Sequence, residues 1–282
     1  MNKLSIYTKS KTLLVNALSK HVDLTILDEE KALTSEFDVY FHSGAINENV
    51  IRLVNNANKT IVNSNSARTD ILNKVDIEKE KVNIVYPAIR APKIKPKKLR
   101  KQFCKELDID KKNRIIFFTA RTLKSNGVKE FFDTISTLNN DNYKIIIASD
   151  ETQINTLKFQ IAKFKLDDKV IFYEDYKDMD LLYAVSDIFV LPTYVKNFSI
   201  NILKAMSLKT AVFVSSNNSA KEVVDVFATM ESPTDPNTSF KIDALLNNKN
   251  ELKLIKKQNE KVAKRFYIQK QIQSLLVILN IT

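Results

Sequence analysis

Histidine and cysteine, the side chains that most often bind metals or act as nucleophiles, are scarce in this sequence. The 282 residues contain two histidines, His21 and His42, and one cysteine, Cys104. These are too few to assemble a zinc site of the usual ligand types. The sequence also has no Gly-x-x-x-x-Gly-Lys-Ser/Thr loop, no Gly-x-Gly-x-x-Gly motif and no serine elbow. Nucleotide hydrolysis, dinucleotide redox chemistry and serine-based hydrolysis therefore lack support.

His42 is the histidine best placed for chemistry. It lies at the end of the predicted strand 37–43, next to Ser43 and Gly44. In open parallel sheets, ligands bind at the carboxyl ends of the strands, so a residue at such an end is a candidate for a site. We expect His42 either to face a ligand in an interdomain cleft or to be a hydrogen-bonded structural residue. His21 precedes a strand and is expected at a helix end.

Two series of strands and helices position the residues at strand ends. Segments rich in β-branched and aromatic residues predict one set of strands at 4–8, 23–27, 37–43, 59–64 and 82–87. A second set is predicted at 114–120, 143–149, 169–175, 187–193 and 211–216. Between them, apolar residues spaced by three and four predict amphipathic helices. Strands that alternate with helices imply parallel sheets covered on both faces, so we predict two doubly wound α/β lobes.

The segment 87–98 separates the two series. It contains three prolines and five basic residues, and it can neither continue a helix nor occupy a central strand. We interpret it as an interdomain linker. The predicted organisation is a short first lobe over residues 1–90, a second lobe over residues 91–255, and a C-terminal helix over residues 256–282. That helix either packs on the core or crosses back to the first lobe.

The residues that follow the strands of the second lobe carry a resemblance to a known family. The segment DIFVLPTYVKNFSINILKAMSLKTAVFVSS (187–216) resembles the signature of the retaining GT-B glycosyltransferases of family 4, also called glycosyl transferases group 1. Upstream, FFTARTLKSNGVKEFFDTI (117–135) and VIFYEDYKDMDLLYAVSD (170–187) are similar to two further family segments. SNSARTDIL (64–72) followed by VNIVYPAI (82–89) adds a fourth. The order and spacing of four segments make the resemblance specific over about residues 60–280.

The resemblance implies a GT-B architecture of two Rossmann-like lobes, with the nucleotide sugar bound to the second lobe. The implied activity moves a sugar from a nucleotide-diphosphate sugar to a glycan or lipid-linked acceptor in cell-surface polysaccharide or glycoconjugate synthesis. It implies no metal and no cofactor other than the donor. Arg121 matches an arginine that neutralises the diphosphate, and Gly127 matches the glycine of the same motif. Glu222 matches a glutamate near the donor, although a helix N-terminal acid is an equal interpretation, and His42 matches a sugar contact.

Several positions depart from the family pattern. Asn126 stands where the family has a lysine, so one phosphate-neutralising charge is missing unless Lys124 replaces it. Lys196 and Lys204 stand where the family has two glutamates, eight positions apart. Lysine is cationic and donates hydrogen bonds only, so it cannot accept from ribose hydroxyls, but it can bind a phosphate or carboxylate.

The glycines of the family are missing as well. Asn197, Phe198 and Ser199 occupy the positions of its Gly-Phe-Gly segment, and the first lobe has TKSK (8–11) where a glycine pair is expected. Side chains at these positions restrict the backbone. The sequence therefore leaves two hypotheses open: a glycosyltransferase with altered donor contacts, or a GT-B-like protein that has lost catalysis and acts as a binding or partner-stabilising module.

The net charge of +11 predicts an anionic partner, which could be a nucleotide, a membrane surface or a nucleic acid. The basic segment 90–105 has only one aromatic residue, Phe103, so it lacks the interleaved stacking side chains of single-strand binders and disfavours nucleic acid. The same segment could face anionic lipid. No apolar run is long enough to span a bilayer and no signal peptide is evident, so we expect a cytoplasmic protein, with peripheral contact to the inner face of the membrane.

Overall fold

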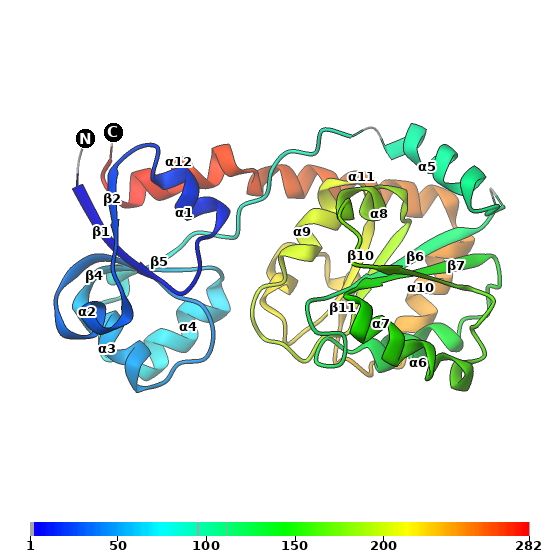
Figure 1. The fold of residues 1–282 in the computed structure, drawn as a ribbon, viewed down its shortest axis with the longest axis horizontal. Coiled ribbons are helices and arrows are strands. Elements are labelled where there is room, and N and C mark those ends of the chain that lie inside the picture. Colours follow the sequence, from blue (N-terminus) through cyan, green and yellow to red (C-terminus); the bar gives the residue numbers. More distant parts are fainter. Residues whose placement is uncertain (1–2, 95, 111, 282) are drawn as a thin grey trace. The chain divides into compact units, whose positions relative to one another are not determined.

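The computed structural model describes residues 3–94, 96–110 and 112–281. The chain divides into two compact units, which are treated separately below. Unit 1 comprises residues Met1–Ala91 together with Arg265–Thr282, and unit 2 comprises residues Pro92–Lys264. Each unit has its own parallel sheet with helices on both faces (Figure 1). The expected α/β class with two Rossmann-like lobes is therefore observed.

Unit 1 contains a five-stranded parallel sheet in the order β2-β1-β3-β4-β5. Its strands are β1 (Lys3–Thr8), β2 (Asp23–Ile26), β3 (Phe37–Phe41), β4 (Ala57–Val62) and β5 (Val82–Ile84). Its helices are α1 (Leu13–Leu18), α2 (Glu29–Thr34), α3 (Glu48–Asn56), α4 (Asn65–Lys74), the 3-10 turn η1 (Lys79–Lys81) and α12 (Ile268–Ile278). Four of these helices have an N-cap residue whose side chain accepts a hydrogen bond from a backbone amide of the first turn. These residues are Thr12, Asp28, Asn47 and Ser64.

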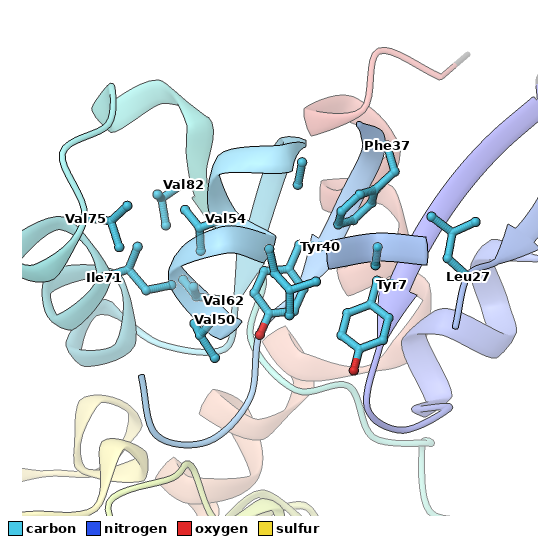
Figure 2. Close-up of a cluster of buried hydrophobic side chains, with 13 residues drawn as sticks. Tyr7, Leu27, Phe37, Tyr40, Val50, Val54, Val62, Ile71, Val75 and Val82 are labelled. Carbon is cyan, nitrogen blue, oxygen red and sulfur yellow. The ribbon is translucent and has the colours of Figure 1, made fainter. Parts of the chain in front are cut away.

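The alternation of side chains along the strands of unit 1 produces two hydrophobic layers. Tyr7 and Tyr40 point to the layer covered by α2, α3 and α4, where Figure 2 shows them among the buried aliphatic side chains. Their neighbours Ile6 and Val39 belong to the opposite layer, under α1 and α12. Ile272 and Leu275 of α12 are part of that second layer, so the last helix of the chain completes the core of its first lobe.

Unit 2 contains a six-stranded parallel sheet in the order β11-β10-β9-β6-β7-β8. Its strands are β6 (Arg114–Thr119), β7 (Tyr143–Ser149), β8 (Val170–Glu174), β9 (Ile188–Leu191), β10 (Ala211–Ser215) and β11 (Thr229–Met230). Its helices are α5 (Pro96–Glu106), α6 (Val128–Ser136), α7 (Glu151–Lys158), α8 (Met179–Val185), α9 (Ile200–Ser207), α10 (Asn237–Asn247) and α11 (Lys249–Ala263). The 3-10 turns are η2 (Ile161–Phe164), η3 (Ser219–Val223), η4 (Val226–Ala228) and η5 (Lys264–Phe266), the last at the boundary with unit 1.

The order of the strands in unit 2 places its helices. From β6 the chain moves through α6 to β7 and through α7 to β8, and it then returns to β9 beside β6 and continues outward to β10. Because crossovers between parallel strands are right-handed, a reversal of direction moves the connecting helices to the other face. Figure 1 accordingly shows α6, α7 and α10 on one face of the sheet and α8, α9 and α11 on the other. α5 packs on α8.

A buried carboxylate joins the helices to the sheet in unit 2. Asp187, at the start of β9, is 4% exposed, and its two carboxylate oxygens lie 2.7 Å from the guanidinium of Arg100 and 3.0 Å from Nζ of Lys256. The backbone amide of Ile115 donates to the same carboxylate at 3.0 Å. Burial acts to raise the pKa of Asp187, but Lys256 and Arg100 outweigh it, so the pKa lies below its ordinary value and the group is ionised.

The helical pattern at the C-terminus differs from the prediction. Instead of one helix over 256–282, α11 ends at Ala263, η5 (Lys264–Phe266) interrupts the helix, and α12 begins at Ile268. α11 lies in unit 2 and α12 in unit 1. The interruption at η5 lets consecutive helices pack on different sheets.

The predicted linker over residues 87–98 is shorter in the structure. Ala88 and Ile89 are buried, and Ile89 forms a parallel bridge to Tyr267 in unit 1. At the other end α5 already begins at Pro96, because proline is tolerated in the first turn of a helix, where its missing amide has no partner to lose. Lys95 of this segment lies outside the described residues. Among those described, no helix is long and apolar enough to cross a bilayer.

Candidate donor site in unit 2

The direction of the chain reverses between β6 and β9, which are neighbours in the sheet. After β6 the chain turns toward β7, and after β9 it turns the other way toward β10. Such a switch point, at the carboxyl ends of parallel strands, is where ligands bind in open α/β sheets. The two loops that leave the switch point are residues 120–127 and 192–199, and we call them the first and second switch loops. They contain most of the residues that the sequence predicted for a donor site.

The two switch loops are fastened to each other. The backbone amide of Tyr194 donates to the carbonyl of Ser125 at 3.2 Å, and the hydroxyl of Thr193 donates to Oδ1 of Asn126 at 2.8 Å. Nδ2 of Asn126 donates to the carbonyl of Thr122 at 2.8 Å. The side chain of Asn126 is therefore used to hold the two loops together, a role that the sequence prediction did not include.

Gly127 lies at the closest approach of the two loops. Its φ is +79°, and a Cβ atom added to it would lie 1.8 Å from the carbonyl oxygen of Pro192. Backbone carbonyl and Cβ cannot approach so closely, so only glycine fits at this position. Gly127 was predicted as a donor-binding residue, and the structure gives it a packing role between the loops.

We predict that Gly127→Ala destabilises the protein by about 3 kcal/mol or more, because both the left-handed backbone and the overlap with Pro192 oppose the added methyl group. Gly44→Ala is the matched control, since Gly44 also has a positive φ of +103° but no atom within 4 Å of the added Cβ. Gly44→Ala should lower the free energy of unfolding by only about 1 kcal/mol, which is the cost of the left-handed backbone alone. Thermal unfolding of both variants measures the difference, and equal shifts would contradict the packing role.

A buried asparagine fixes the second switch loop. Asn218 is 1% exposed, and its Nδ2 donates to the carbonyls of Val195 and Asn197 at 2.8 and 2.7 Å. Its Oδ1 accepts from the amides of Ser199 and Ala220 at 3.2 and 3.0 Å. Two donor hydrogens and two lone pairs are thereby all used. Sequence analysis missed Asn218, although an asparagine three residues after the buried strand β10 is a polar residue near a strand end.

The residues of the second switch loop that replace the family glycines fit this backbone. No described residue among 192–199 has a positive φ, so neither Asn197 nor Ser199 stands where glycine is required. Phe198 is buried, whereas Lys196 and Asn197 are exposed. The carbonyl of Lys196 accepts from the amide and the hydroxyl of Ser219 at 2.9 and 3.0 Å. The loop is therefore held from the β10 side through its backbone.

Replacement of Asn218 by alanine should cost about 2–4 kcal/mol, because two buried carbonyls and two amides lose their partner at once. Asn217→Ala is the control: Asn217 is exposed and is the preceding residue, so its removal should change stability by less than about 0.5 kcal/mol. Chemical denaturation of both variants gives the two values. Similar losses in the two variants would show that Asn218 does not hold the loop.

A pocket of about 430 Å³ lies beside the first switch loop, at the carboxyl ends of β6, β7 and β8. It is lined by Thr119, Ala120, Arg121, Ala148, Ser149, Asp150, Asp175, Tyr176, Met179, Tyr183, Asn201 and Lys204. Of the predicted site residues, this lining brings together Arg121 and Lys204. It does not include Lys124, Asn126, Gly127, Lys196, Asn197, Phe198, Ser199 or Glu222.

The charges of the pocket are divided between its two sides. Arg121 at the end of β6 and Lys204 on α9 supply the positive charge. Asp150 at the end of β7 and Asp175 at the end of β8 supply the negative charge. Asp175 has a left-handed backbone with φ of 46°, a conformation in which aspartate is enriched. The pocket is thus suited to a ligand that carries an anionic group at one end and hydrogen-bond donors at the other.

Two amides that the sequence analysis missed hold the pocket wall. The side chain of Asn201, in the first turn of α9, donates to the carbonyl of Thr119 at 3.3 Å. Gln153, in α7, accepts from the amide of Leu123 at 2.7 Å and donates to the carbonyl of Arg121 at 3.0 Å. The backbone at Arg121 is therefore fixed while its side chain remains exposed. Both amides stand in the first turn of a helix that follows a strand, which is the pattern that could have identified them.

Glu222 and His42 do not line the pocket. Glu222 is in η3 (Ser219–Val223), a half-buried position on the turn that Asn218 caps. His42 belongs to unit 1, where it is 6% exposed and its Nδ1 lies 3.0 Å from the hydroxyl of Tyr40. Burial lowers the pKa of His42 to about 4, aided by Lys9, although a hydrogen bond to the backbone of Gly44 opposes the shift. His42 is therefore neutral at physiological pH.

The depressed pKa of His42 makes stability depend on pH. The folded pKa of about 4 lies below the ordinary value of 6.5. The stability that comes from burying a neutral His42 is therefore fully present above pH 6.5 and is lost as the pH falls to 4. The loss is about 3 kcal/mol at most. His42→Gln should flatten the profile of unfolding free energy between these values, whereas His21→Gln, at an exposed position, should leave it unchanged. Urea unfolding at pH 5 and 7.5 tests this, and an unchanged slope in His42→Gln would refute it.

Comparison with known proteins decides the family. Residues 100–262, more than half of the chain, match the family described as Glycosyl transferases group 1. The chain belongs to this family. The match covers the pocket, both switch loops and the buried cluster around Asp187, so the resemblance that the four sequence segments suggested is confirmed at the level of the family.

One curated relative is N,N'-diacetylbacillosaminyl-diphospho-undecaprenol alpha-1,3-N-acetylgalactosaminyltransferase of Campylobacter jejuni subsp. jejuni. It is 32% identical over 125 residues, which are 43% of this chain and 31% of the relative. The matched part of this glycosyl transferases group 1 chain thus spans about a third of that protein.

Solved structures share the fold. Alr3699/HepE of Anabaena, in complex with UDP, has a TM-score of 0.80 at 14% identity, with 99% of this chain and 100% of that chain covered. A glycosyltransferase of Rickettsia africae has a TM-score of 0.75 at 17% identity, covering 98% and 76%. WaaG, a glycosyltransferase involved in lipopolysaccharide biosynthesis, has a TM-score of 0.70 at 14% identity, covering 96% and 85%. At these identities the likeness shows the GT-B fold alone.

Proposed function

We propose that this protein is a retaining glycosyltransferase of the family 4 type with a divergent donor site. The sugar would move from the diphosphate of a nucleotide sugar to a hydroxyl of a glycan or lipid-linked acceptor, with its anomeric configuration kept. The observation that carries the proposal is the pocket at the strand ends of unit 2, with Arg121 and Lys204 on one side, in a chain that belongs to the family.

In this proposal Arg121 binds the diphosphate and stabilises the negative charge that develops on it as the sugar leaves. A guanidinium suits phosphate oxygens because it can donate two parallel hydrogen bonds. The hydrogen bond from Gln153 to the carbonyl of Arg121 fixes the backbone from which this side chain extends. A charge that is positioned before the reaction stabilises the transition state without further reorganisation.

Lys204 changes what this site can offer a donor. A carboxylate there would accept hydrogen bonds from ribose, whereas the ammonium group can only donate, and it adds positive charge near Arg121. The acceptors of the pocket are Asp150 and Asp175 on the opposite side. Asp150 already accepts from the amide of Gln153 at 2.9 Å, so Asp175 is the more available carboxylate. We infer that the nucleoside extends from Arg121 toward Asp175.

The other predicted residues remain proposals. Lys196 is exposed on the second switch loop, next to Asn197, and both would contact the sugar or the acceptor. Lys124, Asn126, Phe198 and Ser199 shape the switch loops around the donor, and Glu222 lies near them on η3. His42 would contact the sugar or acceptor as a neutral imidazole, and no metal takes part.

The comparisons support a choice of substrates to test. One relative is named as acting on a diphospho-undecaprenol-linked substrate, and Anabaena HepE was crystallised with UDP and with UDP-glucose. For this chain we propose a nucleoside-diphosphate sugar, with UDP as the first nucleotide to test, and an acceptor carried on a lipid or a growing glycan. Such an acceptor is consistent with a cytoplasmic protein that works at the inner face of the membrane.

Nucleotide binding tests the donor site. Ligands that bind the native state raise the melting temperature, so a panel of nucleoside diphosphates and sugar nucleotides can be screened by thermal shift and followed by calorimetry. Arg121→Ala should weaken binding of the best nucleotide about 10- to 100-fold through loss of charge-assisted hydrogen bonds. Arg52→Ala, at an exposed arginine of α3, is the control and should bind normally.

Lys204 distinguishes two ways in which the site could work. If Lys204 binds phosphate, Lys204→Glu should weaken binding more than Lys204→Ala, because the introduced carboxylate repels the diphosphate. Tighter binding in Lys204→Glu would instead mean that the site needs the carboxylate that the family has, and the proposed role of Lys204 would fall.

The second candidate is a GT-B-like binding module without catalysis, and the lysines at positions 196 and 204 favour it. Release of the free nucleotide from a sugar nucleotide in the presence of membrane extract separates the two. Release that Arg121→Ala abolishes supports transfer. Tight nucleotide binding without release, over a panel of sugar nucleotides, supports the binding module.

A further inference from the structure

Two helices of unit 2 expose rows of lysines to solvent. Among the described side chains, α5 and the part of α11 after Leu252 each carry three exposed lysines spaced by three or four residues, so each row lies on one side of its helix. We call these six residues the lysine face: Lys98, Lys101, Lys105, Lys253, Lys257 and Lys261.

The sides of α5 and α11 that face away from the lysine face contact the same buried carboxylate. Arg100 of α5 and Lys256 of α11 bind the carboxylate of Asp187 at 2.7 and 3.0 Å. Phe103 and Leu252 are buried on the same inner sides, at 5% and 2% exposure. Both helices therefore lie near the amino end of β9, and the buried ion cluster fixes which side of each helix remains outside. The lysine face is a consequence of the fold and not of loop conformation.

The lysine face is not neutralised by its surroundings. Within the described part of the chain, none of its six lysines forms an ion pair, whereas exposed lysines elsewhere do, as Lys129 does with Asp133. Glu106 and Glu251 are the exposed acids of α5 and α11, and Glu106 accepts a hydrogen bond from Gln102 at 2.8 Å. Glu260 is committed to Lys209 and Lys264. A positive surface of unit 2 is left open to an anionic partner.

Apolar side chains at the lysine face indicate which anionic partner fits. Leu254 on α11 is 48% exposed, and Leu107, which directly follows α5, is 40% exposed. Phe103, the aromatic residue of α5, is buried, so it cannot stack on a nucleic acid base. Lysines around exposed leucines match a bilayer surface, where ammonium groups meet lipid phosphates and leucines enter the interface.

We propose that the lysine face binds the surface of an anionic lipid bilayer and so holds unit 2 against the membrane. Each lysine near such a surface strengthens binding by about fivefold. The proposal concerns binding alone and does not require sugar transfer, so it can be tested without a donor or an acceptor.

The experiment measures co-sedimentation of the full chain with vesicles of equal parts phosphatidylcholine and phosphatidylglycerol. Two triple variants, Lys98→Gln/Lys101→Gln/Lys105→Gln and Lys253→Gln/Lys257→Gln/Lys261→Gln, should each reduce partition by at least about tenfold. The matched control is Lys20→Gln/Lys31→Gln/Lys163→Gln, exposed lysines that likewise make no ion pair with a described residue. It removes the same charge and should reduce partition by less than about threefold.

Several outcomes would overturn the proposal. Equal loss in the control triple would mean that net charge alone attracts the protein, and wild-type chain that stays in the supernatant would mean that no such surface exists. Preference for an oligonucleotide over vesicles, lost in the two face variants, would assign the surface to nucleic acid. Leu254→Ser should weaken partition about threefold without changing its salt dependence. An unchanged partition would show that Leu254 does not take part in membrane binding.

Nucleotide binding by the same variants keeps this test separate from the proposed function. The lysine face does not line the pocket, so all three triple variants should bind the nucleotide as the wild type does. A wild type that binds vesicles but no nucleotide would reject the donor site and leave the membrane surface standing. The reverse result would reject the membrane surface alone.

Discussion

Unit 2 depends on one buried negative charge. Asp187 sits at the start of the central strand β9, and its carboxylate collects two cations and one backbone amide from β6, α5 and α11. Its own backbone amide donates to the carbonyl of Ile115, and its carbonyl accepts from Ala211 at the start of β10. A buried carboxylate is tolerated only when partners replace its lost hydration, so this group makes the positions of both helices obligatory. These contacts align β6, β9 and β10 at the amino end of the sheet, so the carboxyl ends of these strands also lie side by side.

At the carboxyl ends, hydrogen bonds between loops replace the regular ladder. Asn126, Asn218, Gln153 and Asn201 each connect one strand end or switch loop to another. Side-chain amides suit this task because each can donate and accept at once, whereas charged groups can do only one. The result is a backbone that is held rigidly while the charged side chains of Arg121 and Lys196 stay exposed. A fixed backbone reduces the entropy that these side chains would lose on binding a ligand.

The sequence predicted the elements of the sheet well and the contacts between loops poorly. The buried strands β6, β7, β9 and β10 are nearly continuous apolar runs, and such runs between polar turns leave little choice of structure. A motif match proposed Arg121 and Lys204, and the structure places both in the lining of the pocket, Arg121 just after β6 and Lys204 in the last turn of α9. The predictions that Gly127 and Asn126 contact the donor stay predictions, but the sequence did not predict their contacts with Pro192, Thr193 and Thr122 of the switch loops.

The misses have a common physical cause. The distance between a Cβ and the carbonyl of Pro192, or the four bonds of Asn218, depends on residues far apart in the chain, which no local pattern encodes. β11 escaped prediction because it has two residues, and the break between α11 and α12 has no proline or glycine to mark it. Pro96 was taken as a breaker although the first turn of a helix accepts it.

The first lobe is discontinuous in the chain, since α12 completes a core that begins at β1. During synthesis the residues of β1 to β5 emerge first, yet the helix that covers one face of their sheet emerges only after all of unit 2. At the usual rate of about 5–20 residues per second, that interval is roughly 10–35 seconds. For this time Ile6, Val39 and Ile61 lack part of their cover, and the nascent lobe must remain incomplete or be shielded by a chaperone. The order of the segments therefore lets unit 2, continuous in the chain, fold before unit 1 is finished.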